Sequence, residues 1–276
     1  MAIQTVRAQV NGQWYNLTLN SGNGRYEATL NAPGQTSYNQ PGGYYNVIVE
    51  ATNTAGTTAT ADGSAMPGLK LVVKETIPPV ITILSPSSGA YVTNNKQPVV
   101  FTITDEINGS GVNPDSVMVK IDEEIADSST VSKTSITNGY SFTYTPATAL
   151  SDGSHTVEIS ASDYDGNKAD TKSTIFTVDT VPPTLNVTSP SEGIVTNNAS
   201  LTVQGTTNDT TSSPVTITIM LNDVDQGAVE VLSGSFSKVL TLAEGENTIQ
   251  ITATDSAGKT SAVTRHVTLD TSAPEI

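Results

Sequence analysis

The 276-residue chain has 27 acidic and 12 basic residues and a net charge of −15. A surface this acidic repels nucleic acid and anionic membranes, so we expect neither as a partner. The absence of cysteine excludes disulfide and thiol chemistry.

The first 74 residues predict a shortened β-sandwich. The stretch TVRAQVNGQWYNLTLN contains Asn11-Gly12, a strong signal for a hairpin between two alternating segments. It aligns with VTITIMLNDVDQGAVEVL, which starts in the third predicted strand of the last repeat, so this segment lacks the first two strands. Either the tail Ala61–Lys74 closes a compact variant, or a partner supplies the missing strands at an open edge by β-augmentation.

A short motif with an acidic residue and proline then recurs as ETIPP at 75–79, DTVPP at 179–183 and DTSAP at 270–274. The copies lie roughly 100 residues apart, the size of one β-sandwich domain. Proline fixes its own φ and favours an extended conformation in the residue before it, so the motif predicts a short, stiff linker. We therefore predict domains at 1–74, 75–178 and 179–270, with 271–276 starting a linker to an absent further domain. The alternative is that this end docks onto another molecule.

Within 75–178 and 179–270, apolar and polar residues alternate in short runs separated by Gly turns, and no segment shows a helical period. These runs predict all-β, tandem immunoglobulin-like (Ig-like) sandwich domains in an elongated array. The predicted strands are 80–84, 99–104, 116–121, 140–144, 156–162 and 171–178, followed by 184–188, 201–206, 215–221, 234–240, 247–254 and 261–269.

Each repeat resembles a known kind of Ig-like module. DEINGSGVNPDSVMVKID and YTPATALSDGSHTVEISASDYDGN, in the second repeat, resemble bacterial Ig-like surface repeats. SPSEGIVTNNASLTVQGTTND and GSFSKVLTLAEGENTIQITATDSAGK, in the third, are similar to the Ig-like B domain of glucodextranase-type enzymes. GRYEATLNAP and YYNVIVEATNTAG, in the first, resemble a module of Ig-like proteins in prophage tail clusters of Gram-positive gut bacteria. These resemblances imply a fold, and Ig-like modules serve many roles.

Catalysis finds no support in the sequence. The two histidines, His155 and His266, lie far apart in or beside predicted strands. A nucleophilic triad or a histidine-rich metal site needs convergent partners, and none is indicated. Acidic groups such as Asp163/Asp165 and 122–124 lie in predicted hairpin turns without a flanking aromatic cleft. We expect a protein that is not an enzyme.

Calcium binding is the sharpest hypothesis about chemistry. In an Ig-like sandwich the incoming linker and two strand-connecting loops lie at one end, which gathers oxygen ligands of the kind calcium prefers. Such a cation would lock neighbouring domains at a fixed angle. The alternative is turn chemistry, in which Asp and Asn bond their own backbone. The candidates are Glu75, Asp105, Glu106, Asp163, Asp165 and Asn167 at the first junction, and Asp179, Asn208, Asp209 and Asp255 at the second.

Carbohydrate binding is a third possibility, because the first repeat holds the only Trp and five of the nine Tyr residues. Adjacent aromatic residues in a strand point to opposite faces, so part of this set is expected in the core. The rest could form an exposed strip that stacks on sugars. The candidates are Trp14, Tyr15, Tyr38, Tyr44 and Tyr45.

Three functional classes follow from these features. The first is a structural spacer of a virion, as a phage tail or baseplate accessory protein, which needs no secretory signal; none is visible here. The second is the stalk of a cell-surface adhesin or of a secreted glycoside hydrolase. The third is a sugar-binding module. We expect partners among virion or cell-surface proteins and host-cell glycans, and a location in a virion or outside the cell.

Overall fold

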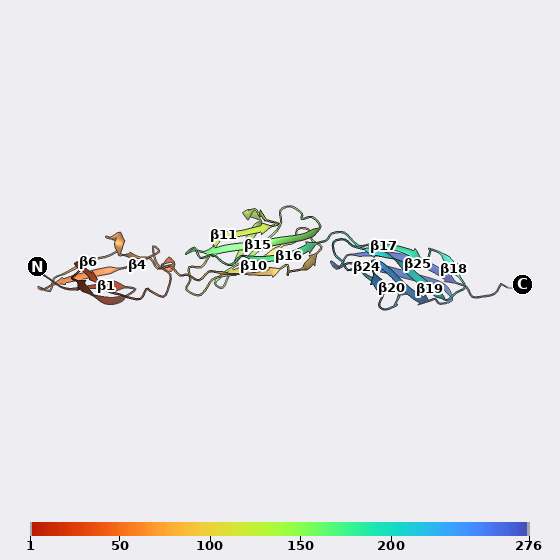
Figure 1. Ribbon diagram of the computed structural model, residues 1–276, viewed down its shortest axis with the longest axis horizontal. Coiled ribbons are helices and arrows are strands. Elements are labelled where there is room, and N and C mark those ends of the chain that lie inside the picture. Colours follow the sequence, from red (N-terminus) through yellow and green to blue (C-terminus); the bar gives the residue numbers. More distant parts are fainter. Residues whose placement is uncertain (1, 275–276) are drawn as a thin grey trace.

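The computed structural model describes residues 2–274, and three groups of β-sheets follow one another along its long axis (Figure 1). We refer to the parts that hold them as the first, second and third domains. The all-β prediction is confirmed: the only helical segments among the described residues are three short 3-10 turns. Within the same range, no helix has the length and apolarity to cross a membrane. Glu275 and Ile276, at the end of the predicted linker, and Met1 lie outside the described residues.

The first domain is built on one five-stranded sheet in the order β3-β2-β1-β5-β6, with Asn11 and Gly12 at positive φ in the predicted hairpin. β4 and β7 form a separate two-stranded ribbon, and the tail after β7 bonds to η1, where the Val73 carbonyl accepts from the Ser37 amide at 2.8 Å. The elements are β1 (Ile3–Val10), β2 (Gln13–Asn20), β3 (Arg25–Glu27), η1 (Ser37–Asn39), β4 (Tyr45–Asn46), β5 (Ile48–Asn53), β6 (Thr58–Ala61), η2 (Pro67–Leu69) and β7 (Lys70–Leu71).

The second domain is a two-sheet sandwich, with sheets β13-β14-β10-β8 and β12-β11-β15-β16-β9. Alternating residues of both sheets meet in a core in which Phe101, Phe142 and Phe176 are fully buried. The elements are β8 (Val80–Ser85), β9 (Ala90–Val92), β10 (Val99–Thr104), β11 (Val112–Ile121), β12 (Glu124–Ile125), η3 (Ser128–Thr130), β13 (Val131–Ile136), β14 (Gly139–Tyr144), β15 (Gly153–Asp163) and β16 (Lys172–Val178).

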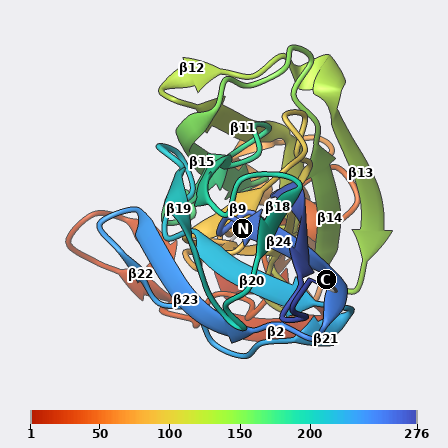
Figure 2. The same ribbon diagram turned by 90° about the vertical axis from the view of Figure 1, so that its right-hand side faces the viewer.

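The third domain repeats this plan with sheets β17-β19-β23-β22 and β18-β25-β24-β20-β21. Its core contains Ile219, Leu240, Ile249 and Ile251. Viewed along the long axis, β12 and β13 of the second domain extend beyond the outline of the third (Figure 2). The elements are β17 (Thr184–Ser189), β18 (Ile194–Thr196), β19 (Ser200–Asn208), β20 (Thr216–Leu221), β21 (Val224–Asp225), β22 (Val231–Leu232), β23 (Ser235–Thr241), β24 (Gly245–Thr254) and β25 (Thr260–Leu269).

Candidate metal centres at the domain junctions

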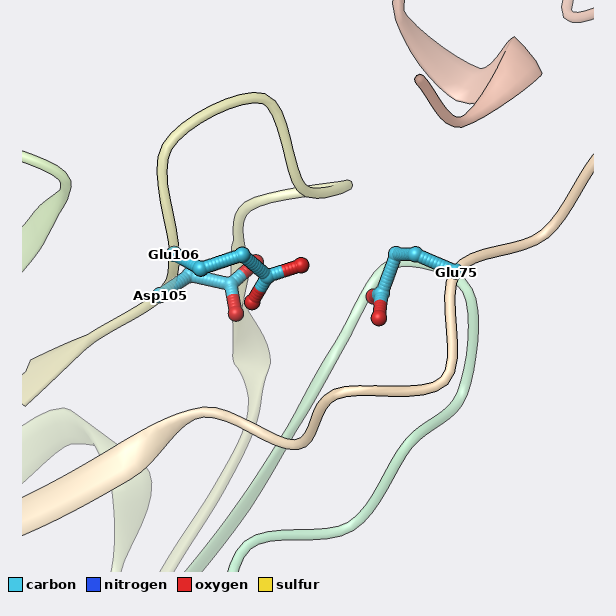
Figure 3. Close-up of side chains that lie close together, drawn as sticks. All are labelled: Glu75, Asp105 and Glu106. Carbon is cyan, nitrogen blue, oxygen red and sulfur yellow. The ribbon is translucent and has the colours of Figure 1, made fainter. Parts of the chain in front are cut away.

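At the first junction, three carboxylates from two segments converge. Glu75 lies in the linker, and Asp105 and Glu106 come directly after β10. One ligand oxygen from each lies within 4.8 Å of the other two. Figure 3 shows the Glu106 side chain extending from its loop toward Glu75, with Asp105 beside it. The sequence placed these three residues together, and the structure does the same.

The loop after β10 is shaped to hold the two carboxylates. Gly111 and Asn108 take positive φ, which turns the chain back so that the Gly111 amide donates to Asp105 Oδ2 at 2.7 Å. A Cβ added at Gly109 would lie 2.5 Å from Glu106 Oε1 and 2.9 Å from Asp105 Oδ2. A larger residue at this position would push the carboxylate ends aside, so Gly109 lets the loop backbone lie directly against them.

The hydrogen-bond donors of the protein satisfy this cluster only in part. Asp105 is 7% exposed, yet its Oδ1 is buried without a hydrogen-bond partner, as is Oε2 of Glu106. Burial, and next the neighbouring Asp105, raise the pKa of Glu106 to about 7. Burial also raises the pKa of Glu75. A bound cation stabilises carboxylates that are at least partly buried, repel one another and keep oxygens without donors.

The other first-junction candidates surround the cluster. Asp163 is buried, and although burial raises its pKa, hydrogen bonds to Glu75, Asn167 and Gly166 outweigh this and lower it. Asn167 donates to Asp163 Oδ2 at 2.7 Å and to the Glu75 carbonyl at 3.2 Å. Asp165 instead accepts from the Glu75 amide at 3.1 Å and from the Thr36 hydroxyl of the first domain. The structure thus uses these side chains to position the linker.

The second junction repeats the arrangement with Asp179 from the linker, Asp209 after β19 and Asp255 after β24, again with ligand oxygens within 4.8 Å of one another. All three are buried, and Asp179 is 0% exposed. Asp255 Oδ1 accepts from the Lys259 amide at 2.8 Å, whereas its Oδ2 is buried without a partner. Asn208, the fourth candidate, is exposed, and its carbonyl accepts from the Thr184 hydroxyl at 2.9 Å.

Two serines that sequence reasoning missed also touch the clusters. The Ser110 hydroxyl donates to Glu75 Oε1 at 3.2 Å, and the Ser212 hydroxyl donates to Asp179 Oδ2. Ser110 follows Glu106 and Ser212 follows Asp209 within a few positions, in the short stretches GSG and TSSP. This closeness in sequence to the acidic residues is the only signal that could have predicted the two serines. Each donor set consists entirely of oxygen atoms, which suits a hard cation such as calcium.

The aromatic candidates of the first domain are dispersed. Trp14 is 41% exposed and stacks under the Arg7 guanidinium, 4.3 Å from the ring centroid. Tyr15 is half-buried, on the opposite face of the same strand, and Tyr45 is buried. Lys70 lies over the ring of Tyr44 at 4.6 Å. Tyr38 stacks on Tyr164 of the second domain with centroids 4.6 Å apart. The five rings therefore form no common strip.

The histidines occupy structural positions in two different domains. The ring of His155 is buried, with Nδ1 2.6 Å from Asp122 Oδ2 and Nε2 2.8 Å from the Ser151 carbonyl. His266 is paired on the surface with Glu192 at 2.8 Å. In these contacts each ring binds an acidic side chain of its own domain.

Comparisons with known proteins agree with this architecture. Residues 85–180 match the family model of a bacterial Ig-like domain, and residues 183–271 match that of glucodextranase domain B. No curated protein sequence matches the chain.

Among solved structures, the fibronectin(III)-like modules of CbhA from Clostridium thermocellum share 16% identity, covering 68% of this chain and 93% of theirs, with a TM-score of 0.42. The titin Ig tandem A164-A165 shares 10%, covering 70% and 97%, with a TM-score of 0.27. SGBP-B of the Bacteroides ovatus mixed-linkage glucan utilization locus, in complex with a mixed-linkage heptasaccharide, shares 14%, covering 96% and 60%, with a TM-score of 0.25. The chain is a tandem array of Ig-like domains, the second matching the bacterial Ig-like domain family and the third the glucodextranase B-domain family.

Proposed function

We propose that the chain is a non-catalytic spacer whose domain junctions are fixed by calcium. The observation that carries this proposal is the repetition of one arrangement at both junctions, where a linker carboxylate meets two carboxylates of the following domain. Each junction has at least one buried carboxylate oxygen without a hydrogen-bond donor: Asp105 Oδ1 and Glu106 Oε2 at the first, and Asp255 Oδ2 at the second. Turn chemistry alone would have satisfied these oxygens.

A cation at either site would tie the linker to the domain that follows it. Three carboxylates provide enough charge to hold calcium, and nearby hydroxyl and water oxygens can complete its shell of six to eight ligands. Because the linker also contains proline, little freedom would remain at the hinge. The result is an extended array of fixed length and direction, which suits a protein that presents or connects other components.

For the setting, we propose a phage tail or baseplate accessory protein that contacts other virion proteins. The alternative is a stalk or carbohydrate-binding region of a bacterial surface adhesin or secreted glycoside hydrolase, which the match of residues 183–271 to glucodextranase domain B favours. Neighbouring genes distinguish the two: tail, tape-measure or holin genes support the first, and sortase or hydrolase genes support the second. Immunogold labelling of purified virions gives an independent answer.

Thermal unfolding of the full chain with calcium, magnesium or chelator tests the calcium proposal. Calcium at 100 times its dissociation constant should stabilise a folded domain by about 2.7 kcal/mol. The Asp209→Asn/Asp255→Asn double variant should lose only the shift that belongs to the third domain, while the second domain still responds. Melting curves that are identical in calcium and chelator would remove calcium as a structural ligand.

A further inference from the structure

A cavity of about 610 Å³ adjoins the first acidic cluster. Its walls come from the first domain, from the loop after β10, from the β13–β14 hairpin and from the end of β15. Asp105 and Glu106 line it directly, so the cluster at this junction opens toward space that a ligand can enter. The carboxylates of the second junction are each at most 8% exposed, whereas Glu75 and Glu106 are only half-buried.

The chemistry of the lining favours a neutral ligand with many hydroxyl groups. Two aromatic rings, Tyr140 and Tyr164, contribute flat apolar surface, and Tyr164 is 41% exposed. Asn39, Asn108 and Asn138 add amide donors and acceptors. All the lining residues are uncharged except the two carboxylates, so an anionic ligand would be repelled. Aromatic faces combined with a few polar groups are typical of sites that orient small ligands.

The positions of these groups are set by the fold. Tyr164 is held by its stack on Tyr38 of the first domain, 4.6 Å between centroids with 12° between the planes. The Asn39 side chain, at the end of η1, donates to the Gly109 carbonyl at 2.7 Å, which joins the first domain to the loop that carries the carboxylates. The first domain therefore contributes Gln35 and Asn39 to a cavity whose other walls belong to the second domain. A ligand that fills it would contact both.

We propose that this cavity binds a saccharide, and that a calcium ion held by Glu75, Asp105 and Glu106 is ligated directly by sugar hydroxyl groups. The second half of this inference rests on the proposed calcium function. Calcium takes six to eight oxygen ligands, and three carboxylates with one serine hydroxyl leave positions free for an external ligand. The open first site is thus the binding site, and the closed second site is structural.

The test uses the full chain on an array of glucose, N-acetylglucosamine, mannose and galactose oligosaccharides, in calcium and in chelator. Isothermal titration with calcium alone is run in parallel on each variant. Tyr164→Ala removes an exposed ring together with its stack on Tyr38, so Tyr38→Ala, which breaks the same stack but keeps the Tyr164 ring, is its control and should bind saccharide more tightly than Tyr164→Ala. Asn108→Gly removes an amide at a residue whose φ of 71° glycine adopts without strain. Circular dichroism confirms that the variants fold. Asp255→Asn is the control at the other junction.

We expect the protein to bind an oligosaccharide in calcium and to lose it in chelator. Tyr164→Ala and Asn108→Gly should bind the saccharide at least tenfold more weakly while their calcium titration is unchanged. Asp255→Asn should bind the saccharide as the unmodified protein does. If calcium binds and no oligosaccharide is retained, the saccharide inference is wrong while the spacer function stands. Retention that persists in chelator overturns ligation through the ion. Polylysine is printed on the same array as a cationic probe, and its retention without that of any oligosaccharide overturns the choice of a neutral ligand. Absence of calcium binding in the titration counts against the proposed function itself.

Discussion

Replacing Glu106 with glutamine should have opposite effects in the absence and presence of calcium. Without calcium, Glu106 is a carboxylate that is disfavoured by burial and by Asp105, which is why its pKa rises from its ordinary 4.5 to about 7. In the folded state it therefore retains a proton up to about pH 7, whereas the unfolded chain releases it near 4.5. The stability linked to this proton is fully present below pH 4.5 and is lost as pH rises through 7.

The magnitude follows from the size of the shift. A change from 4.5 to about 7 corresponds to roughly 3 kcal/mol between the two protonation states. The side chain is only half-buried and borders the cavity, so solvent screening reduces this to about 1–2 kcal/mol. Glu106→Gln should therefore stabilise the calcium-free second domain by about 1–2 kcal/mol at pH 8 and change it little at pH 4. In calcium the variant should be the less stable protein, because one of three carboxylate ligands is gone.

Differential scanning calorimetry of the full chain at pH 4, 6 and 8, in calcium and in chelator, measures both effects. Asp255→Asn is the matched control, since it changes the other junction and should leave the transition of the second domain in place. The reasoning is refuted if Glu106→Gln and the unmodified protein show the same dependence on pH in chelator. It is also refuted if glutamine lowers stability in chelator at pH 8.

Three further substitutions test packing and the junction. His155→Ala removes the hydrogen bonds of a buried ring and should lower the free energy of unfolding in urea by about 2–3 kcal/mol. His155→Asn should lose less, because Asn247, the third residue of β24 as His155 is of β15, binds the carbonyl four residues earlier in the same way; equal losses would contradict this. Gly205→Ala places a Cβ 2.3 Å from a backbone carbonyl of β17 and should cost about 2–3 kcal/mol by thermal melting, whereas Gly34→Ala meets nothing within 4 Å and should be neutral. Tyr38→Ala removes an interdomain stack worth about 1 kcal/mol, so small-angle scattering should show a broader range of lengths while both domains stay folded; an unchanged profile would argue against that role.

The pattern of alternation was sufficient to locate most strands of the second and third domains. The predictions 80–84, 99–104 and 140–144 coincide with β8, β10 and β14 within one residue at each end. These strands alternate between a buried and an exposed face, and the period of two reports that directly. β13 was missed because it is an edge strand whose side chains are almost all exposed, so no apolar alternation marks it. The short parallel strands β9 and β18 were missed for a related reason, since three residues are too few to show a period.

For the junctions, the chain itself determined which carboxylates could meet. The incoming linker and two strand-connecting loops lie at one end of an Ig-like sandwich, so topology predicted that Glu75 lies near the polar residues that follow β10 and β15, and Asp179 near those that follow β19 and β24. Only the tertiary structure decided which of these acidic side chains keep a carboxylate oxygen without a hydrogen-bond donor. Asp165 is bound by Thr36 of the preceding domain, and Asn208 faces solvent because the side chains of a strand alternate. Whether a carboxylate receives a hydrogen bond depends on donors that come from segments far apart in sequence, and no local sequence pattern encodes their distances.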